Sequence, residues 1–140
     1  MTDTELRTIE QSVHIAAPPE TVWQYWVDPD RMAQWWGVAA RLEPRAGGEC
    51  RIEMQQGPVM IGEFVELDAH KRLVFSFGWD GNPAGDPLAP GSTRVEVTLE
   101  PDATGTRLTL RHELPASHAS EHEEGWRHYL GILAERAGAN

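Results

Sequence analysis

The 140-residue chain has a single cysteine and few basic residues. Because Cys50 has no second cysteine to pair with, an internal disulfide is excluded, and a reducing compartment is compatible with the sequence. The 12 Lys and Arg residues stand against 22 Asp and Glu residues, which gives a formal net charge of −10. This balance disfavours nucleic acids and anionic membranes as partners, since phosphate recognition needs a basic surface.

Long apolar runs are also missing from the chain. No segment approaches the roughly 20 apolar residues that a membrane-spanning helix requires. The first residues, MTDTELRTIE, carry acids and no apolar core, so we expect no signal peptide. These absences predict a cytoplasmic protein, with residues 1–140 forming a single domain large enough for a hydrophobic core.

The C-terminal segment 117–138 has apolar side chains at helical spacing, which predicts a long amphipathic helix. Ser120 and Glu123 fit a capping box at its start, and Ser117 is an earlier candidate cap. Such a helix needs an apolar surface to lie on. Its apolar stripe comprises Trp126, Tyr129, Leu130, Leu133 and Ala137, extended upstream by His118 and His122.

The preceding residues alternate between apolar and polar side chains, as strands do. We predict one strand over 7–16, two short helices over 18–36, and a series of strands over 38–114. Asp28 and Pro29 suit the cap and first position of the second short helix. Short turns between the strands favour an antiparallel meander of about six to seven strands.

The sequence does not determine the structure of two segments. The strand near 59–67 is apolar on both faces, so its inward side is undetermined. The Gly- and Pro-rich loop 80–92 is too long for a tight hairpin. It is either a tolerated surface insertion or a flap over a cavity mouth.

This order of elements predicts an α+β fold in which a curved antiparallel sheet wraps around the long C-terminal helix. Four stretches resemble the START-like, helix-grip (SRPBCC) superfamily, and within it the bacterial branch similar to the activator of heat-shock-protein-ninety ATPase. The stretches are APPETVWQYWVDPDRMAQWWG at 17–37, RAGGECRIEM at 45–54, GEFVELDAHKRLVFSFGW at 62–79 and HEEGWRHYLGIL at 122–133.

The resemblance implies a helix-grip fold with a cavity between the helix and the sheet, but it leaves the function open. The superfamily includes lipid and hormone carriers, aromatic polyketide cyclases, oxygenase domains and chaperone co-factors. Family members often follow the double tryptophan with Gly-Pro. Here Gly37 and Val38 stand at that place, so we expect a shifted loop.

Histidine is the residue type most able to carry chemistry here. His112 shares a strand face with Leu108 and Leu110, so it should point toward the helix. It is a hydrogen-bonded core histidine, a strand-end histidine near solvent, or the polar anchor of a pocket. Glu63 or Glu66 could orient it as a base.

Neither a metal site nor a nucleophile is expected. His118 and His122 have a metal-compatible spacing, but no third ligand accompanies them, so we expect neither a metal nor a cofactor. Cys50 alternates onto an apolar face, where a thiol is inert.

The high tryptophan count, six in all, suits core packing, yet several aromatic residues could converge on one opening. Met54 would add an adaptable wall, and His112 or the Tyr129 hydroxyl would orient a ligand. The expected ligand-binding residues are Trp26, Trp35, Trp36, Met54, Phe64, Phe75, Phe77, Trp79, His112, Trp126, Tyr129, Leu130 and Leu133.

Three functions fit this sequence. The first is binding of a small hydrophobic or aromatic ligand in the cavity, with no catalytic residue assigned. The second is a chaperone or stress-response interaction module, which would need an exposed apolar patch. The third is a cyclase- or hydrolase-type enzyme that uses His112 as its acid or base. A homodimer through the sheet edges is also open.

Overall fold

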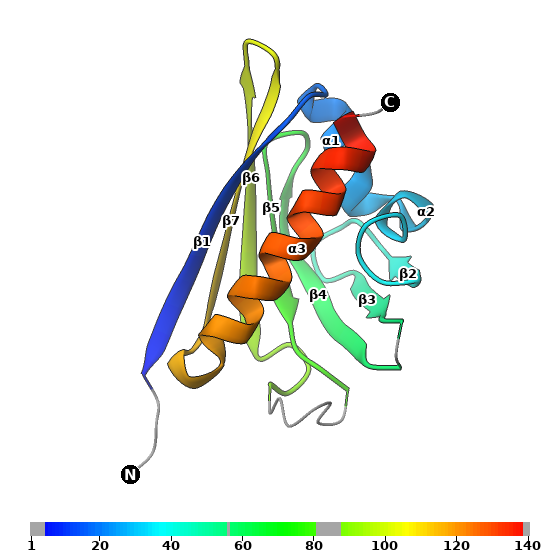
Figure 1. The fold of residues 1–140 in the computed structure, drawn as a ribbon. Helices are drawn as coiled ribbons and strands as arrows, with labels where there is room; N and C mark the ends of the chain where they lie inside the picture. Colours follow the sequence, from blue (N-terminus) through cyan, green and yellow to red (C-terminus); the bar gives the residue numbers. More distant parts are fainter. Residues whose placement is uncertain (1–4, 56, 81–87, 139–140) are drawn as a thin grey trace.

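The computed structural model describes residues 5–55, 57–80 and 88–138. Its strands form one antiparallel seven-stranded sheet in the order β1-β7-β6-β5-β4-β3-β2, and helix α3 lies across one face of it (Figure 1). This is the predicted α+β helix-grip fold. The elements are β1 (Leu6–Ile15), α1 (Pro19–Val27), α2 (Pro29–Met32), β2 (Ala39–Leu42), β3 (Glu49–Glu53), β4 (Val59–Asp68), β5 (Arg72–Phe77), β6 (Thr93–Asp102), β7 (Gly105–Pro115), the 3₁₀ helix η2 (Ala116–His118) and α3 (Ala119–Gly138).

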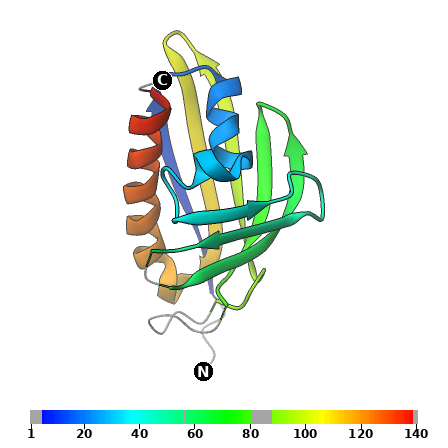
Figure 2. The ribbon, with the colours of Figure 1, turned by 90° about the vertical axis from the view of Figure 1, so that its right-hand side faces the viewer.

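The sheet curves strongly, so that β2 and β3 run across the direction of β6 and β7 (Figure 2). Part of this curvature arises in β4, where the register with β5 shifts between Phe64 and Glu66. A β-bulge of this kind bends a strand and increases its twist. Gly62 precedes the bulge, and a Cβ atom there would lie 1.8 Å from the carbonyl oxygen of Ser76. Only glycine allows β4 and β5 to approach so closely at this point.

The short helices α1 and α2 follow the predicted signals. Pro19 occupies the first turn of α1, and the Asp28 side chain accepts a hydrogen bond of 3.0 Å from the backbone N–H of Asp30 at the start of α2. Helix α2 ends at Met32, earlier than the predicted span to 36, and the following residues continue as a turn. Gly37 has a φ of +78°, which glycine adopts without strain, and it redirects the chain into β2.

The inner face of the sheet and one stripe of α3 form the core. Up to the bulge, the even-numbered side chains of β4 point inward, because Met60 and Phe64 are buried whereas Ile61 and Val65 are half-buried. Beyond the bulge the alternation reverses, so that Leu67 packs against the core. The sequence pattern alone left this open.

The apolar stripe of α3 is confirmed: Trp126, Leu130, Leu133 and Ala137 are buried. The capping box predicted at Ser120 is wrong. Helical structure starts at Ala116, directly after Pro115, so Ser120 already lies inside the first turn of α3. A turn of 3₁₀ helix often precedes an α-helix and replaces a side-chain cap there.

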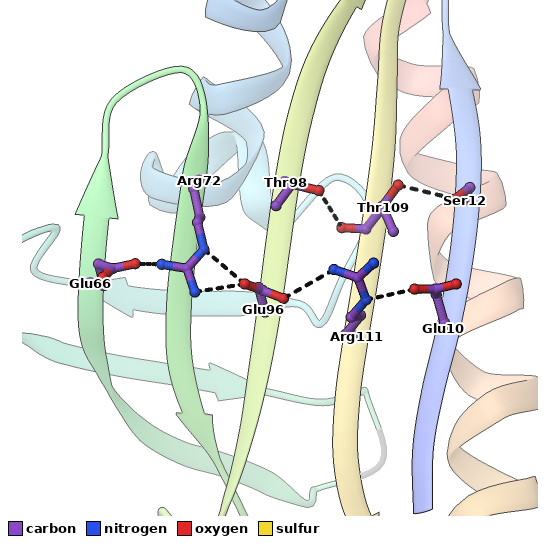
Figure 3. Close-up of polar contacts among 8 residues, drawn as sticks. All are labelled: Glu10, Ser12, Glu66, Arg72, Glu96, Thr98, Thr109 and Arg111. Carbon is purple, nitrogen blue, oxygen red and sulfur yellow. Dashed lines mark hydrogen bonds and ion pairs between the residues drawn. The ribbon is translucent and has the colours of Figure 1, made fainter.

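The outer face of the sheet carries a chain of charges across five strands (Figure 3). Glu96 on β6 accepts a 2.8 Å hydrogen bond from Arg72 Nε and a 3.4 Å hydrogen bond from Arg111 Nη1. Arg111 also donates to Glu10 at 2.6 Å, and Arg72 forms an ion pair with Glu66. These contacts hold the pKa of Glu96 below its usual range, first through the hydrogen bond from Arg72. We refer to these five residues as the outer charge ladder.

None of the helices in the described part of the chain combines the length and apolar character needed to cross a membrane. Most of the predicted Gly- and Pro-rich loop, residues 81–87, lies outside the described residues.

Candidate ligand-binding cleft

A cleft of about 250 Å³ opens beneath the N-terminal half of α3. It is larger than the roughly 150 Å³ cavity that holds benzene, and smaller than the roughly 300–1,000 Å³ pockets of drug-sized ligands. A molecule of one or two rings therefore fits within it, and a third ring would extend through the open mouth. The lining residues are Trp36, Met54, Phe77, Trp79, Glu121, His122, Gly125, Trp126 and Tyr129.

Helix α3 supplies one wall through two rows of side chains with a spacing of four. Glu121, Gly125 and Tyr129 form one row, and His122 and Trp126 form the other. A Cβ atom added at Gly125 would meet no atom within 4 Å. The missing side chain therefore leaves open space between the Glu121 carboxylate and the Tyr129 ring, and it is one direct cause of the cleft.

Aromatic rings from the sheet side and from the segment after α2 form the opposite wall. The rings of Trp36 and Phe77 stack with a centroid distance of 6.2 Å and an interplanar angle of 1°. The ring of Trp79 meets Phe77 edge-on at 5.4 Å, and Trp126 tilts against Trp36 at 5.0 Å. Trp36, Phe77 and Trp126 are buried and form the deep part, whereas Trp79 and Tyr129 are half-buried at the mouth.

A buried hydrogen-bond chain fixes the position of Trp126. Its indole Nε1–H donates to His112 Nδ1 at 3.1 Å, and His112 Nε2 lies 2.9 Å from Thr93 Oγ1. The Thr93 hydroxyl donates to the carbonyl oxygen of Phe77 at 2.9 Å. An indole can only donate, so Nδ1 must be unprotonated and Nε2 must carry the proton given to Thr93. All three side chains are therefore held in one arrangement with His112 neutral.

The environment of His112 reinforces this protonation state. Burial, followed by the nearby His122 ring, lowers the pKa of His112 to about 3. The expectation that Glu63 or Glu66 orients His112 is wrong, because its two ring nitrogens contact Trp126 and Thr93 instead. His112 lies behind the cleft and supports its wall.

The polar groups at the mouth of the cleft come from α3. The Glu121 side chain is exposed, and the half-buried His122 ring meets Phe77 and His112, each edge-on at 5.5 Å. Burial raises the pKa of the Tyr129 hydroxyl, which keeps the phenol neutral. The mouth therefore presents a carboxylate, an imidazole and a phenol around an apolar interior.

The structure separates the predicted ligand-binding residues into two groups. Six of them line the cleft: Trp36, Met54, Phe77, Trp79, Trp126 and Tyr129. The others lie in the core outside its lining: Trp26, Trp35, Phe64, Phe75, His112, Leu130 and Leu133.

Sequence reasoning missed Glu121, His122 and Gly125 as lining residues. The available signal was their spacing of four from Tyr129 and Trp126, which places all five residues on neighbouring rows of one helix.

The remaining chemical candidates are inert or dispersed. Burial raises the pKa of the Cys50 thiol to about 12, so it is not a nucleophile at neutral pH. Within the described ranges, no group of three or more His, Cys, Asp or Glu side chains could hold a metal ion. A larger hollow of about 690 Å³ lies over the outer side of β4, but carboxylates of Glu43, Glu49 and Glu63 contribute to its lining, so it does not suit an apolar molecule.

Several solved structures are similar to this protein in fold and in sequence. The solution structure of the AHSA1-like protein RHE_CH02687 from Rhizobium etli is 37% identical over 99% of this chain and 86% of its own, with a TM-score of 0.75. CalU16 from Micromonospora echinospora is 25% identical over 92% of this chain and 71% of its own, with a TM-score of 0.68.

DynU16, a protein of the dynemicin biosynthetic locus, is 27% identical, and the match covers 91% of this chain with a TM-score of 0.78. The match covers 46% of DynU16, so the chain spans about half the length of that relative. Among curated proteins, none matches the chain. The family described as "Activator of Hsp90 ATPase homolog 1-like protein" matches residues 16–138. The chain therefore belongs to this family and has its START-like, helix-grip fold.

Proposed function

We propose that this protein binds a small aromatic or apolar molecule in the cleft beneath the N-terminal half of α3. The observation that carries this proposal is the cleft itself, which aromatic rings line and Gly125 keeps open. Burial of apolar ligand surface contributes about 25 cal/mol per Å², before the cost of association. The Trp126 ring is held in place by the Trp126–His112–Thr93 hydrogen bonds, so this wall needs little ordering when a ligand enters.

The enzymatic alternative finds less support in this geometry. A general base must reach its substrate and titrate near the working pH. His112 meets neither condition, because both ring nitrogens are engaged and burial lowers its pKa to about 3. His122 also lines the cleft, where its ring meets those of Phe77 and His112 edge-on, and we assign it no catalytic role.

The interaction-module alternative needs an exposed apolar patch. Among the described residues, the large hydrophobic side chains that are exposed are Leu6 and Val38, at 56% and 57%. Leu6 begins β1 and Val38 precedes β2, at opposite edges of the sheet, so they do not form one patch. The cleft is therefore the better supported binding site.

A pair of matched glycine variants tests the proposal. The probe is N-phenyl-1-naphthylamine, a neutral molecule whose fluorescence rises in apolar surroundings. Gly125→Leu fills the cleft, whereas Gly131→Leu adds the same side chain where the added Cβ also meets no atom within 4 Å and the residue does not line the cleft. Both changes replace a helical glycine with a better helix former, by roughly 1 kcal/mol, so neither should unfold the protein.

We expect one probe to bind per wild-type and Gly131→Leu molecule, and binding by Gly125→Leu to fall at least tenfold. At about 100 times Kd, the probe should add roughly 2.7 kcal/mol to the free energy of unfolding. Absence of binding to the wild type, or equal binding to Gly125→Leu, would contradict the proposal.

A further inference from the structure

The cleft has the composition of a site for an organic cation. Five aromatic residues line it: Trp36, Phe77, Trp79, Trp126 and Tyr129. The faces of such rings are negative, so they attract a cation placed over them, most strongly when the cation has little water to lose. Alkylated ammonium groups meet this condition, because their charge is spread over apolar methyl groups.

The charged residue of the lining has the matching sign. Glu121 stands at the mouth, and the described residues that line the cleft include no Lys or Arg. Gly125 leaves the space one turn along α3 from Glu121 empty. A ligand group in that space would lie between a carboxylate on one side and the Tyr129 ring on the other.

Negative charge also predominates around the cleft and on the protein as a whole. The exposed Glu53 precedes Met54 in the chain, and the exposed Asp80 follows Trp79, so these two lining residues each have an acidic neighbour. The whole protein carries a formal net charge of −10, and such a field raises the local concentration of cations and repels anions. Fatty acids and other carboxylates are therefore poor candidates despite the apolar interior.

We propose that the cleft is selective for a small molecule with an alkylated ammonium group on an apolar or aromatic body, and that Glu121 supplies the counter-charge. This inference rests on the proposed ligand-binding function and adds the ligand's charge. His122 is the other titratable residue that lines this space. Binding is compared at about pH 7, so that the phenol groups of both probes described below stay largely protonated.

Two probes of equal shape test the charge. (3-Hydroxyphenyl)trimethylammonium is a cation, and 3-tert-butylphenol replaces its nitrogen with carbon and is neutral. We expect the cation to bind about tenfold or more tightly in isothermal titration calorimetry with the wild-type protein. Glu121→Gln should reduce the ratio of the two affinities at least threefold, through weaker binding of the cation. Glu124→Gln makes the same charge change on an exposed residue outside the lining and should alter neither affinity by more than twofold.

Equal affinities for the two probes, or tighter binding of 3-tert-butylphenol, would overturn the cation inference. If both probes then fail with Gly125→Leu, the proposed function stands. A preference for the cation that survives Glu121→Gln would overturn the role of Glu121. If neither probe binds while N-phenyl-1-naphthylamine does, only the inference falls; if none of the three binds, the proposed function falls with it.

Discussion

The two halves of helix α3 cover the same sheet face with different results. Helices α1 and α2 lie beside the C-terminal half, shown in red, while the N-terminal half, shown in orange, extends past them (Figures 1 and 2). The C-terminal half buries Leu130, Leu133 and Ala137, and the Tyr25 hydroxyl from α1 lies 3.5 Å from the carbonyl oxygen of Arg136. The N-terminal half has Gly125 in the cleft lining, where no side chain fills the space, and the cleft opens there.

Under the proposed function, stability and binding depend on different halves of one helix. A filled interface gains apolar burial and packing, whereas an open cleft forgoes part of both. Trp126 stands at the junction, since it is buried among the core side chains and lines the cleft as well. Its hydrogen bond to His112 fixes the position of this side chain, which belongs both to the core and to the cleft lining.

The largest effect is expected at this junction. Trp126→Ala removes a buried indole and its hydrogen bond, and should lower the free energy of unfolding by roughly 3–5 kcal/mol. Trp126→Phe keeps much of the packing and leaves His112 Nδ1 without its donor, at a cost of about 1–3 kcal/mol. Urea denaturation measures both values. If Trp126→Ala lowered the free energy of unfolding by less than about 1 kcal/mol, Trp126 would not be the core residue that this comparison requires.

The next prediction separates the two halves directly. Leu133 is fully buried in the C-terminal half, so Leu133→Ala should cost about 2–5 kcal/mol and leave affinity for N-phenyl-1-naphthylamine within about twofold. Met54 is half-buried in the cleft wall, so Met54→Ala should cost less than about 1.5 kcal/mol but weaken binding several-fold. Denaturation and probe titration on both variants test this. Equal losses of stability and affinity in the two variants would refute the separation.

An intermediate effect is expected from pH. His112 has a pKa of about 3 when folded and near 6.5 when unfolded, so the unfolded chain binds the extra proton. Stability is therefore fully present above about pH 6.5 and is lost as pH falls toward 3. Between pH 7 and pH 5 this group alone should remove about 2 kcal/mol.

Denaturation of the wild type and of His112→Gln at both pH values isolates this effect, because the other titrating groups are common to both proteins. His112→Gln should be less stable at pH 7 but should lose about 2 kcal/mol less on acidification. The same pH dependence in both proteins would contradict the neutral, buried state of His112.

The smallest effect is expected on the outer face. Glu96→Gln breaks the centre of the outer charge ladder, where each exposed ion pair contributes about 0–1 kcal/mol. We expect a loss of at most about 1 kcal/mol at low salt, less in 1 M NaCl, and unchanged probe binding. A loss above about 2 kcal/mol, or a change in binding, would show that the outer face supports the cleft.

Most of the fold could be predicted from the sequence, because the hydrophobic periodicity and the helix-cap signals agreed along most of the chain. The alternation of Leu73, Phe75 and Phe77, and the helical stripe through Trp126 and Leu133, each fix an element and its buried face. The inward face of β4 was not readable, because apolar residues occupy both sides and the bulge after Phe64 depends on contact with β5. The helix predicted over 117–138 agrees with η2 and α3, but its cap was wrongly placed at Ser120 because a 3₁₀ turn has no distinctive side-chain pattern.

Only part of the cleft lining could be predicted from the sequence. Large aromatic residues were visible as candidates, but a linear pattern does not distinguish a ring at the cleft, such as Trp36, from one behind it, such as Trp35. The absence of a side chain at Gly125 was as important as the rings. His112 was correctly expected to point toward the helix, yet its partners, Trp126 and Thr93, come from other elements and depend on three-dimensional contact.

The most direct test of the account follows the indole N–H resonances of all six tryptophans by NMR during titration with N-phenyl-1-naphthylamine. Trp36, Trp79 and Trp126 line the cleft, whereas Trp23, Trp26 and Trp35 lie outside its lining. We expect large shifts for the first group, small shifts for the second, and no saturable shifts in Gly125→Leu. Equal shifts in both groups, or shifts confined to the second, would contradict a binding site beneath the N-terminal half of α3.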